Sequence, residues 1–403
     1  MKYFNAPEKG YLDKLYKTID YEEHNAMVEA LEKKIAEGKP DRMKMWLGIN
    51  SRFLLLNAQY NRKGIRYKEY TYDSRLMFEV LAEFQYFCNM YVPYFHRMGP
   101  GAPLELFPDF QNFSEAQWMG AELVFPEDDV PGTRPFLTED NKNILFDRGL
   151  PDPFSGIFAV GWEHYEKFRE YAKDYEIDGS RVVNVWPAGM SSDGPFTLAC
   201  ELLGTTEACV LLYEDPDYMK KLLDFFTTAI INRVKAFRKR WGVAEKLQGW
   251  FMADDSIALL SCEMYQEAVL PFHKRMVDEL IEESGTLNIH LCGDATRHFP
   301  IIQKELRCRN FDTGFPVKHG ELCKTLGPDT TIMGGPSVAF LESHNEEEIE
   351  AEVKRIIEEV TPYTRRFVMR EGNNVPPKMD LGKILAMYRA TVKYGKYGAD
   401  FVT

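Results

Sequence analysis

Short apolar runs alternate along this chain with longer stretches in which apolar residues recur every three or four positions. The short runs are typical of buried strands, and the longer stretches are typical of amphipathic helices. The predicted strands span residues 43–49, 103–107, 182–186, 248–253, 287–291, 309–313, 330–334 and 366–370. Because these strands alternate with helices, we predict an α/β fold, a (β/α)8 TIM barrel. An open doubly wound sheet is the main alternative, but the chain lacks the GxGxxG turn that would favour it.

Two helix boundaries carry capping signals. Asp215 followed by Pro216 predicts the start of a helix that runs to about Trp241. Ser343 and Glu346 have the spacing of a capping box. The apolar residues that follow form one stripe at helical spacing, which consists of Ile349, Val353, Ile356, Ile357 and Val360.

The chain shows no linker rich in Gly, Ser or Pro and no internal repeat. Residues 1–40 differ from the rest because they are polar and place Met27, Leu31 and Ile35 four positions apart. We therefore predict an N-terminal helical extension over 1–40 and a barrel over 41–403.

The early part of the barrel region is less regular than the rest. Residues 120–129 and 132–137 predict an extra hairpin, which we expect over the barrel mouth. Residues 138–180 are predicted to form a second insertion.

The amino-acid composition limits the kinds of binding partner that we expect. The 403 residues are 45% hydrophobic and 28% charged, with a formal net charge of −13. This acidic balance argues against nucleic acid and anionic membrane as main partners, because both attract basic surfaces. A basic protein partner and a homodimer both remain open.

The number and spacing of the cysteines indicate in which cellular compartment we expect the protein. There are seven of them, with no spacing of a disulfide framework. The N-terminus MKYFNAPEKGYLDK has no apolar signal core, and no run of 18 apolar residues occurs. We therefore expect a cytoplasmic protein whose reduced thiols can act as metal ligands.

Polar and titratable residues collect just after the predicted strands, where TIM barrels place their active sites. These residues are Asn50, Arg52, Asp109, Asp254, Asp255, His290, Cys292 and Asn373. Glu201, in the segment GPFTLACE, is expected near the same edge.

His290 and Cys292 form the sharpest feature of this set. Residues i and i+2 of a strand point to the same side, so the imidazole and the thiolate can face one point. This pair of ligands favours a borderline-soft ion, and zinc is the commonest choice. By spacing alone an ordinary buried pair is the alternative, and the place at a strand end favours the metal.

The other candidates each have two interpretations. Asp254 and Asp255 are adjacent, so one is expected to face the barrel axis as a ligand or base, and the other to cap a helix near 261–264. Asp109 is either an inward carboxylate or a turn residue. Arg52 either clamps a substrate oxygen or forms a surface ion pair.

Three further histidines, His96, His164 and His273, are interpreted as packing or surface residues. Ser191 and Ser192 have no GxSxG sequence around them, so a serine hydrolase is not expected.

Four motifs together resemble the uroporphyrinogen decarboxylase superfamily. They are GPFTLACELLG at 194–204, HLCG at 290–293, GGPSVAFL at 334–341 and GNNVPP at 372–377. The resemblance runs from about residue 42 to the C-terminus. It implies a TIM barrel with one of two chemistries, which are cofactor-free decarboxylation of uroporphyrinogen and zinc-dependent methyl transfer to or from a corrinoid on a partner protein.

The chain departs from the decarboxylases of this superfamily. Their arginine-bearing segment after the first strand is replaced by LGINSRF at 47–53. Their catalytic Asp matches Asp109, but their Tyr falls near Glu201 and their late His on Asn373. The resemblance therefore does not imply true porphyrinogen decarboxylation.

The methyltransferases of the superfamily carry His-x-Cys followed by a second Cys. His290 and Cys292 match, and the second Cys position is Asn373. The resemblance then requires a substitute third ligand from Asp255, Glu201 or Glu371, of which we select Asp255. No DxHxxG corrinoid-binding signature occurs, so the corrinoid would come on a separate protein.

The resemblance implies a zinc-dependent methyltransferase that moves a methyl group between a small substrate, such as a methoxylated aromatic, and a corrinoid protein. Asp109 or Glu201 would handle the proton, and Asn50, Arg52 and Asn373 would bind substrate. The alternatives are a metal-independent decarboxylase that uses Asp109 and a non-catalytic barrel that binds a tetrapyrrole or corrinoid.

Overall fold

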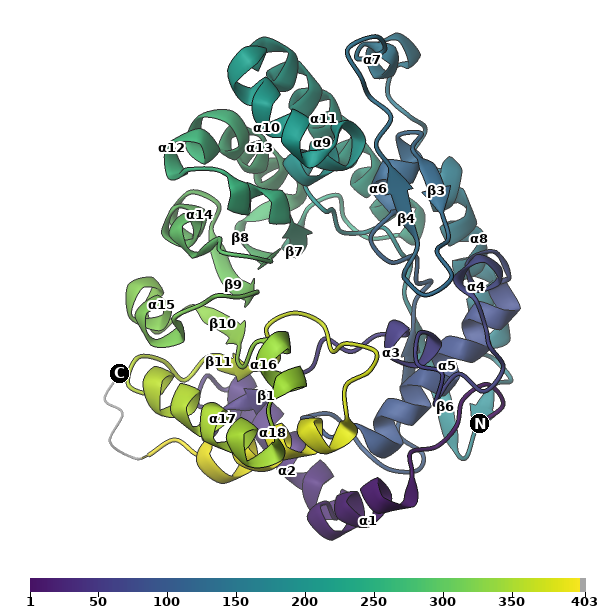
Figure 1. Ribbon diagram of the computed structural model, residues 1–403, viewed down its shortest axis with the longest axis vertical. Coiled ribbons are helices and arrows are strands. Elements are labelled where there is room, and N and C mark those ends of the chain that lie inside the picture. Colours follow the sequence, from purple (N-terminus) through teal and green to yellow (C-terminus); the bar gives the residue numbers. More distant parts are fainter. Residues whose placement is uncertain (399–403) are drawn as a thin grey trace. The chain divides into compact units, whose positions relative to one another are not determined.

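The structure is a computed structural model that describes residues 1–398 (Figure 1). These residues form two compact units. Unit 1 comprises Met1–Leu106, Lys167–Trp186 and the described residues from Thr313 onward. Unit 2 comprises Phe107–Glu166 and Pro187–Asp312. Each unit is therefore assembled from segments that lie far apart in the sequence.

Unit 1 contains parallel strands from both ends of the chain. β11 (Phe367–Met369) lies between β1 (Lys44–Met45) and β10 (Thr331–Gly334), and both pairings are parallel. β2 (Leu104–Leu106) pairs in parallel with β6 (Ser180–Val185). The sequence did not predict the short β5 (Glu176–Ile177), which forms an antiparallel hairpin with β6.

The helices of unit 1 include two in the predicted N-terminal extension. The helices are α1 (Lys9–Thr18), α2 (Tyr21–Ala36), α3 (Arg52–Leu55), α4 (Tyr67–Tyr72), α5 (Ser74–Tyr91), α15 (His319–Leu326), α16 (Val338–Ser343), α17 (Glu346–Val360) and α18 (Leu381–Tyr394). In α2 Leu31 is buried but Ile35 is 41% exposed, because the buried stripe runs through His24, Val28 and Leu31. The boundary between extension and barrel at residue 40 stays a prediction.

α17 and α18 lie side by side in unit 1 (Figure 1) and are joined by Arg389–Glu346 and Lys393–Glu350 ion pairs. The predicted apolar stripe of α17 is buried along its whole length. The predicted capping box was wrong by two residues, because Ser343 still belongs to α16. Asn345 caps α17 instead, with Glu348 as its partner.

Unit 2 contains a further group of neighbouring strands. β8 (Ile281–Leu291) lies between β7 (Leu247–Ala253) and β9 (Cys308–Thr313), whose last residue belongs to unit 1. β7 and β8 are parallel, and the register pairs Phe251 with Asn288 and Ala253 with His290. The predicted hairpin is confirmed as β3 (Glu122–Val124) paired with β4 (Gly132–Arg134).

The helices of unit 2 connect these strands. They are α6 (Ser114–Trp118), α7 (Ile144–Arg148), α9 (Pro195–Leu203), α10 (Thr205–Glu214), α11 (Pro216–Trp241), α12 (Cys262–Met264), α13 (Leu270–Leu280) and α14 (Phe299–Glu305). Short 3₁₀ turns span η1 (Asp255–Leu259) and η3 (Thr296–His298), a π-helical turn spans η2 (Tyr265–Val269), and α8 (Gly156–Tyr171) begins in unit 2 and ends in unit 1. The predicted helix start at Asp215 is confirmed, because its carboxylate accepts a hydrogen bond from Tyr218 N.

Each predicted strand is present, with ends that differ by a few residues. The largest difference is at β8, which begins at Ile281 rather than at residue 287. The sequence EESGT inside that strand contains no apolar residue, so its pattern could not indicate a strand.

Within residues 1–398 no single helix is long and apolar enough to cross a membrane. α9 and α10, which bend by 109° at their junction, pass the same test as a pair by length and composition alone.

Candidate metal centre

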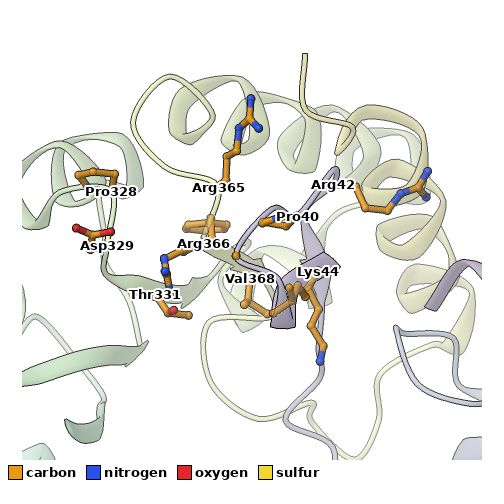
Figure 2. A pocket seen from close by; sticks show the side chains of 12 residues that line it. Pro40, Arg42, Lys44, Pro328, Asp329, Thr331, Arg365, Arg366 and Val368 are labelled. Carbon is orange, nitrogen blue, oxygen red and sulfur yellow. The ribbon is translucent and has the colours of Figure 1, made fainter. Parts of the chain in front are cut away.

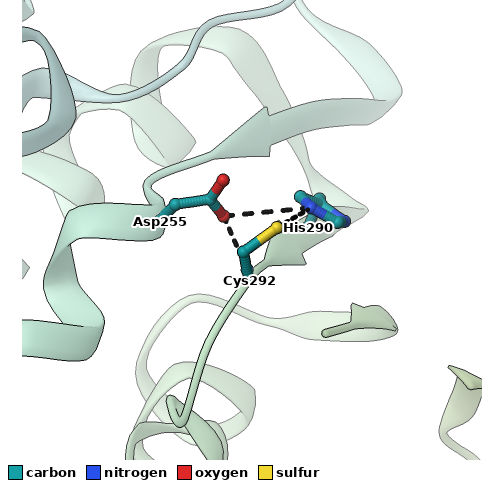
Figure 3. A group of neighbouring side chains, drawn as sticks. All are labelled: Asp255, His290 and Cys292. Carbon is teal, nitrogen blue, oxygen red and sulfur yellow. Dashed lines mark hydrogen bonds and ion pairs between the residues drawn. The ribbon is translucent and has the colours of Figure 1, made fainter. Parts of the chain in front are cut away.

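Three potential ligands converge where β7 and β8 end (Figure 3). His290 is the penultimate residue of β8, Cys292 follows that strand directly, and Asp255 begins the turn after β7. His290 Nε2 lies 2.9 Å from Cys292 Sγ and 3.9 Å from Asp255 Oδ1. Among the described residues these side chains form a group whose ligand atoms all lie within 4.8 Å of one another.

Asp255 is held in place by the backbone of its neighbour. Its Oδ1 accepts a hydrogen bond of 2.7 Å from Cys292 N. This bond ties the turn after β7 to the end of β8, so the carboxylate and the thiol are positioned together.

Asp312 is a site residue that sequence reasoning missed. Its Oδ2 lies 2.8 Å from His290 Nδ1, and the contact directs Nε2 toward Cys292 and Asp255. A carboxylate on the outer nitrogen of a metal-binding histidine commonly fixes its orientation. Asp312 lies in the predicted strand 309–313, so its place near the end of a strand was the available signal.

The hydrogen bonds of His290 also affect its charge. Burial lowers the pKa of the imidazole, but hydrogen bonds to Asp312 and Cys292 outweigh burial and raise the pKa to about 10. Because a metal binds neutral imidazole, metal binding would release this proton.

Asp254 and Asp255, the two residues after β7, have different hydrogen-bond partners. Asp254 is fully buried, and its carboxylate accepts hydrogen bonds from Phe196 N at 3.2 Å and Thr197 N at 2.7 Å. It therefore caps α9. The expected cap near 261–264 was wrong, because Ser261 caps that helix with its own hydroxyl.

The N-terminus of α9 needs this outside cap because its own N-cap residue is Gly194. Gly194 has φ = 85°, and a Cβ there would lie 2.5 Å from the Cβ of Asp254. Only glycine fits both constraints. Asp254 also contacts His273 at 2.8 Å, and His273 in turn contacts Tyr265 at 3.2 Å. His273 is thus a buried packing residue, as one of its two interpretations expected.

Glu201 belongs to a buried acidic cluster in unit 2. Burial, reinforced by the negative charges of Asp193, Glu115 and Asp254, raises the pKa of the Glu201 carboxyl to about 9. Its Oε2 is buried and has no hydrogen-bond partner among the described residues. Burial and Glu115 likewise raise the pKa of Asp193 to about 7.

Glu115 shows how the loop before α9 is anchored. Its Oε1 lies 2.6 Å from a guanidinium nitrogen of Arg233, and both side chains are buried. Its Oε2 accepts hydrogen bonds from Ser192 Oγ at 3.1 Å and Asp193 N at 3.0 Å. The pair therefore fixes the loop that carries Asp193 and Gly194.

Asp109 makes the contacts of a turn residue. Its carboxylate accepts hydrogen bonds from Gln111 N at 3.1 Å and Gln111 Nε2 at 2.8 Å. Of the two interpretations of Asp109, these contacts favour the turn.

The remaining predicted site residues lie in unit 1. Asn50 Oδ1 accepts a hydrogen bond from Arg52 N at 3.1 Å, at the start of α3. Asn373 has φ = 148°, which is rare for a residue other than glycine. Glu371 is fully buried, and its Oε1 contacts Gly48 N at 2.8 Å and Arg370 at 2.9 Å. The structure thus does not bring Glu371 or Glu201 into the ligand group.

A cavity of about 460 Å³ lies elsewhere in unit 1, at the amino ends of β1, β10 and β11 (Figure 2). The charged ends of Arg42, Lys44 and Arg365 point in different directions there. Since TIM-barrel active sites lie at the carboxyl ends of the strands, this cavity is not the candidate active site.

Residues 106–394 match the family described as Uroporphyrinogen decarboxylase (URO-D). The chain belongs to the uroporphyrinogen decarboxylase family. The predicted superfamily is therefore confirmed, and with it the predicted (β/α)8 TIM-barrel fold.

Two similar proteins come from Methanosarcina mazei. A methylated-thiol–coenzyme M methyltransferase is 30% identical over 154 residues, which cover 36% of this chain and 38% of that relative. The chain thus aligns with well under half of that protein's length. A solved structure of a methyltransferase has a TM-score of 0.61 and 17% identity, covering 91% of this chain and 98% of the other. At this identity, the second likeness bears on the fold alone.

Proposed function

We propose that this protein is a zinc-dependent methyltransferase that moves a methyl group between a small substrate and a corrinoid carried by a partner protein. The convergence of Asp255, His290 and Cys292 is the observation that carries the proposal. The similarity to a methylated-thiol–coenzyme M methyltransferase supports the methyltransferase branch of the family.

The three side chains fit zinc. Imidazole, thiolate and carboxylate are its usual protein ligands, at roughly 2.0–2.3 Å from the ion, so tetrahedral ligands stand roughly 3.3–3.8 Å apart. The observed separations of 2.9 and 3.9 Å lie near that range. Three protein ligands leave a fourth position open for substrate, which is the pattern of catalytic sites.

When bound, zinc would supply a Lewis acid for the oxygen or sulfur that gains or loses the methyl group. His290, Cys292 and Asp255 would hold the ion. Asp312 would keep the imidazole turned so that Nε2 faces the ion, through its 2.8 Å contact with Nδ1.

Glu201 is our candidate for the residue that donates a proton to the leaving oxygen. As the methyl group leaves an ether, the electron pair of the broken C–O bond stays on oxygen, so that oxygen needs a proton. A carboxyl with a pKa of about 9 is protonated at neutral pH, and the buried Oε2 has no other partner among residues 1–398. Asp109 is the weaker candidate because both of its oxygens contact Gln111.

The substrate class follows from the ligand set. A set that includes a carboxylate and an imidazole suits an oxygen ligand, so we propose a methoxylated aromatic, which would be O-demethylated. Asn50, Arg52 and Asn373 are proposed to bind substrate. The corrinoid would arrive on a separate protein, and a homodimer remains compatible with the proposal.

The test is methyl transfer from a panel of methoxylated aromatics to a reduced corrinoid protein, with release of CO2 from aromatic and tetrapyrrole acids measured in parallel. We expect zinc-dependent methylation of the corrinoid that is lost in Cys292→Ala. Release of CO2 without zinc or corrinoid would replace the proposal with a decarboxylase. Tight corrinoid binding without turnover, unchanged in His290→Ala, would replace it with a binding-only barrel.

A further inference from the structure

A second layer of side chains lies directly behind the candidate ligands in unit 2. Residues two apart on a strand share a face, so Phe251, Asn288 and Asn310 lie on the same face as Ala253, His290 and Asp312. In the register of β7 and β8, Phe251 lies opposite Asn288 and Ala253 lies opposite His290. Across β8 and β9, Asn310 bonds Asn288 just as Asp312 bonds His290.

Two amides are unusual in this place. The interior layers of TIM barrels are mainly filled with branched apolar side chains. Here Asn310 Nδ2 donates a hydrogen bond to Asn288 Oδ1. One bond between two primary amides leaves an NH2 group and a carbonyl group over, and these make no other hydrogen bond among the described residues. Both asparagines are partly exposed. The remaining NH2 and carbonyl groups are therefore accessible, and this layer suits a polar ligand group that can pair with both.

The neighbouring strand carries a glycine, Gly249, beside the amides. Asn288 Nδ2 lies only 3.6 Å from where a Cβ of Gly249 would be, so the amide faces a position with no side chain. Phe251, on the same face, is 42% exposed, whereas its strand neighbours Trp250 and Met252 are buried. An exposed phenyl ring beside free amide groups can stack on an aromatic ligand.

We infer that Phe251, Asn288 and Asn310 form a substrate subsite that binds an aromatic ring through a neutral hydroxyl placed opposite the methoxy group. The inference rests on the proposed function, since it takes the methoxy oxygen to face the metal ligands. The two layers are two residues apart, roughly 6.6 Å along a strand, which suits the two ends of a para-substituted ring.

The groups left over on the two asparagines favour a hydroxyl over a carboxylate on the ligand. A hydroxyl both donates and accepts, so it can pair with the remaining carbonyl and the remaining NH2 at once. A carboxylate only accepts, and it would lie one layer from the carboxylate of Asp312.

The experiment compares ligands that carry this hydroxyl with ligands that lack it or carry a carboxylate in its place. Binding of hydroquinone and of phenol to the zinc-loaded protein is measured by calorimetry, and methyl transfer from 4-methoxyphenol, methoxybenzene and 4-methoxybenzoate by kcat/KM. We expect the hydroxyl to improve both affinity and kcat/KM roughly tenfold, and the benzoate to be the poorest donor.

In the double variant Asn288→Leu/Asn310→Leu, the preference for the hydroxyl should fall to about onefold while the zinc content is retained, because paired amides can be replaced by apolar groups of similar size at little cost. Phe251→Leu should weaken both ligands equally.

Equal binding of hydroquinone and phenol by the native chain would overturn the subsite, as would a preference that survives in the double variant. The first comparison needs no variant, so a variant that fails to fold does not remove the test. If the hydroxyl preference in binding is present but no methyl group is transferred, the proposed function fails and the subsite stands. If methyl transfer occurs without the preference, only the subsite fails.

Discussion

Asp254 and Asp255 are neighbours in the sequence but have different partners. Asp254 is buried against the N-terminus of α9, and Asp255 contacts Cys292 N at the ligand group. The adjacency of the two carboxylates predicted that only one would face the site, since neighbours on a strand alternate. It could not predict which helix the other would cap, because α9 lies about 50 residues earlier in the chain and meets Asp254 only through packing.

Glu201 gives a prediction about pH. Its pKa of about 9 lies above the ordinary value of 4.5, so between these values the folded chain keeps a proton that the unfolded chain has lost. The stability contributed by this group therefore falls as pH rises from 4.5 to 9. We expect Glu201→Gln to become progressively more stable than the native chain over that range, by less than about 1.4 kcal/mol per pH unit. Urea unfolding at pH 5, 7 and 9 measures the difference, and a constant difference would show that Glu201 ionises normally.

Some site residues could be predicted from a single strand of the sequence, and others depend on contacts between distant segments. His290 and Cys292 could be predicted because two residues on one strand define a common direction. Asp312 could not be assigned to His290, because that contact depends on the pairing of β8 with β9. The protonated state of Glu201 was also beyond prediction, since it arises from burial with carboxylates that come from three other segments.

At the scale of elements, α9 links the sequence motif GPFTLACE to the candidate ligand group. Asp254 caps this helix, and Asp255, the next residue, belongs to the ligand group. The strands themselves could be predicted from runs of apolar residues, and the helix start at Asp215 from its cap. The capping box of α17 was displaced because Ser343 and Asn345 are both good caps, and only the end of α16 decides between them.

Gly194→Ala tests the link between α9 and the ligand group. An alanine there meets both a φ of 85° and the side chain of Asp254 at 2.5 Å. We expect a loss of at least about 2 kcal/mol in unfolding free energy together with weaker zinc binding. Gly204→Ala at the other end of α9 is the matched control, because Gly204 has φ = 90° with no atom near its Cβ position.

Thermal or urea unfolding and a zinc competition assay give the two results for each variant. Backbone strain is common to both glycines, so Gly204→Ala should be destabilised less and should keep its zinc affinity. Equal zinc affinity in the two variants would contradict the link between α9 and Asp255.

At the scale of the whole molecule, the residues proposed for the site are divided between the two units. The ligand group, Glu201 and the proposed subsite all belong to unit 2, whereas Asn50, Arg52 and Asn373 belong to unit 1. The fold class could be predicted because strands and helices alternate over the whole chain. The division into two units could not, since each unit combines segments that are distant in sequence.

The central claim is that this member of the uroporphyrinogen decarboxylase family holds zinc at Asp255, His290 and Cys292. It is tested most directly by the metal content of protein purified without chelator, beside His290→Ala and Cys292→Ala. Cys262→Ala is the matched control, because that thiol lies outside the ligand group and donates a hydrogen bond to the carbonyl of Arg297. Asp312→Asn should cause a partial loss, in which the zinc affinity falls roughly 10- to 100-fold, because Asp312 orients His290 without being a ligand itself.

We expect about one zinc per chain in the native protein and in Cys262→Ala, and almost none in His290→Ala and Cys292→Ala. A native protein without metal, or zinc that persists in both ligand variants, would contradict the account and favour metal-free decarboxylation or a binding-only barrel.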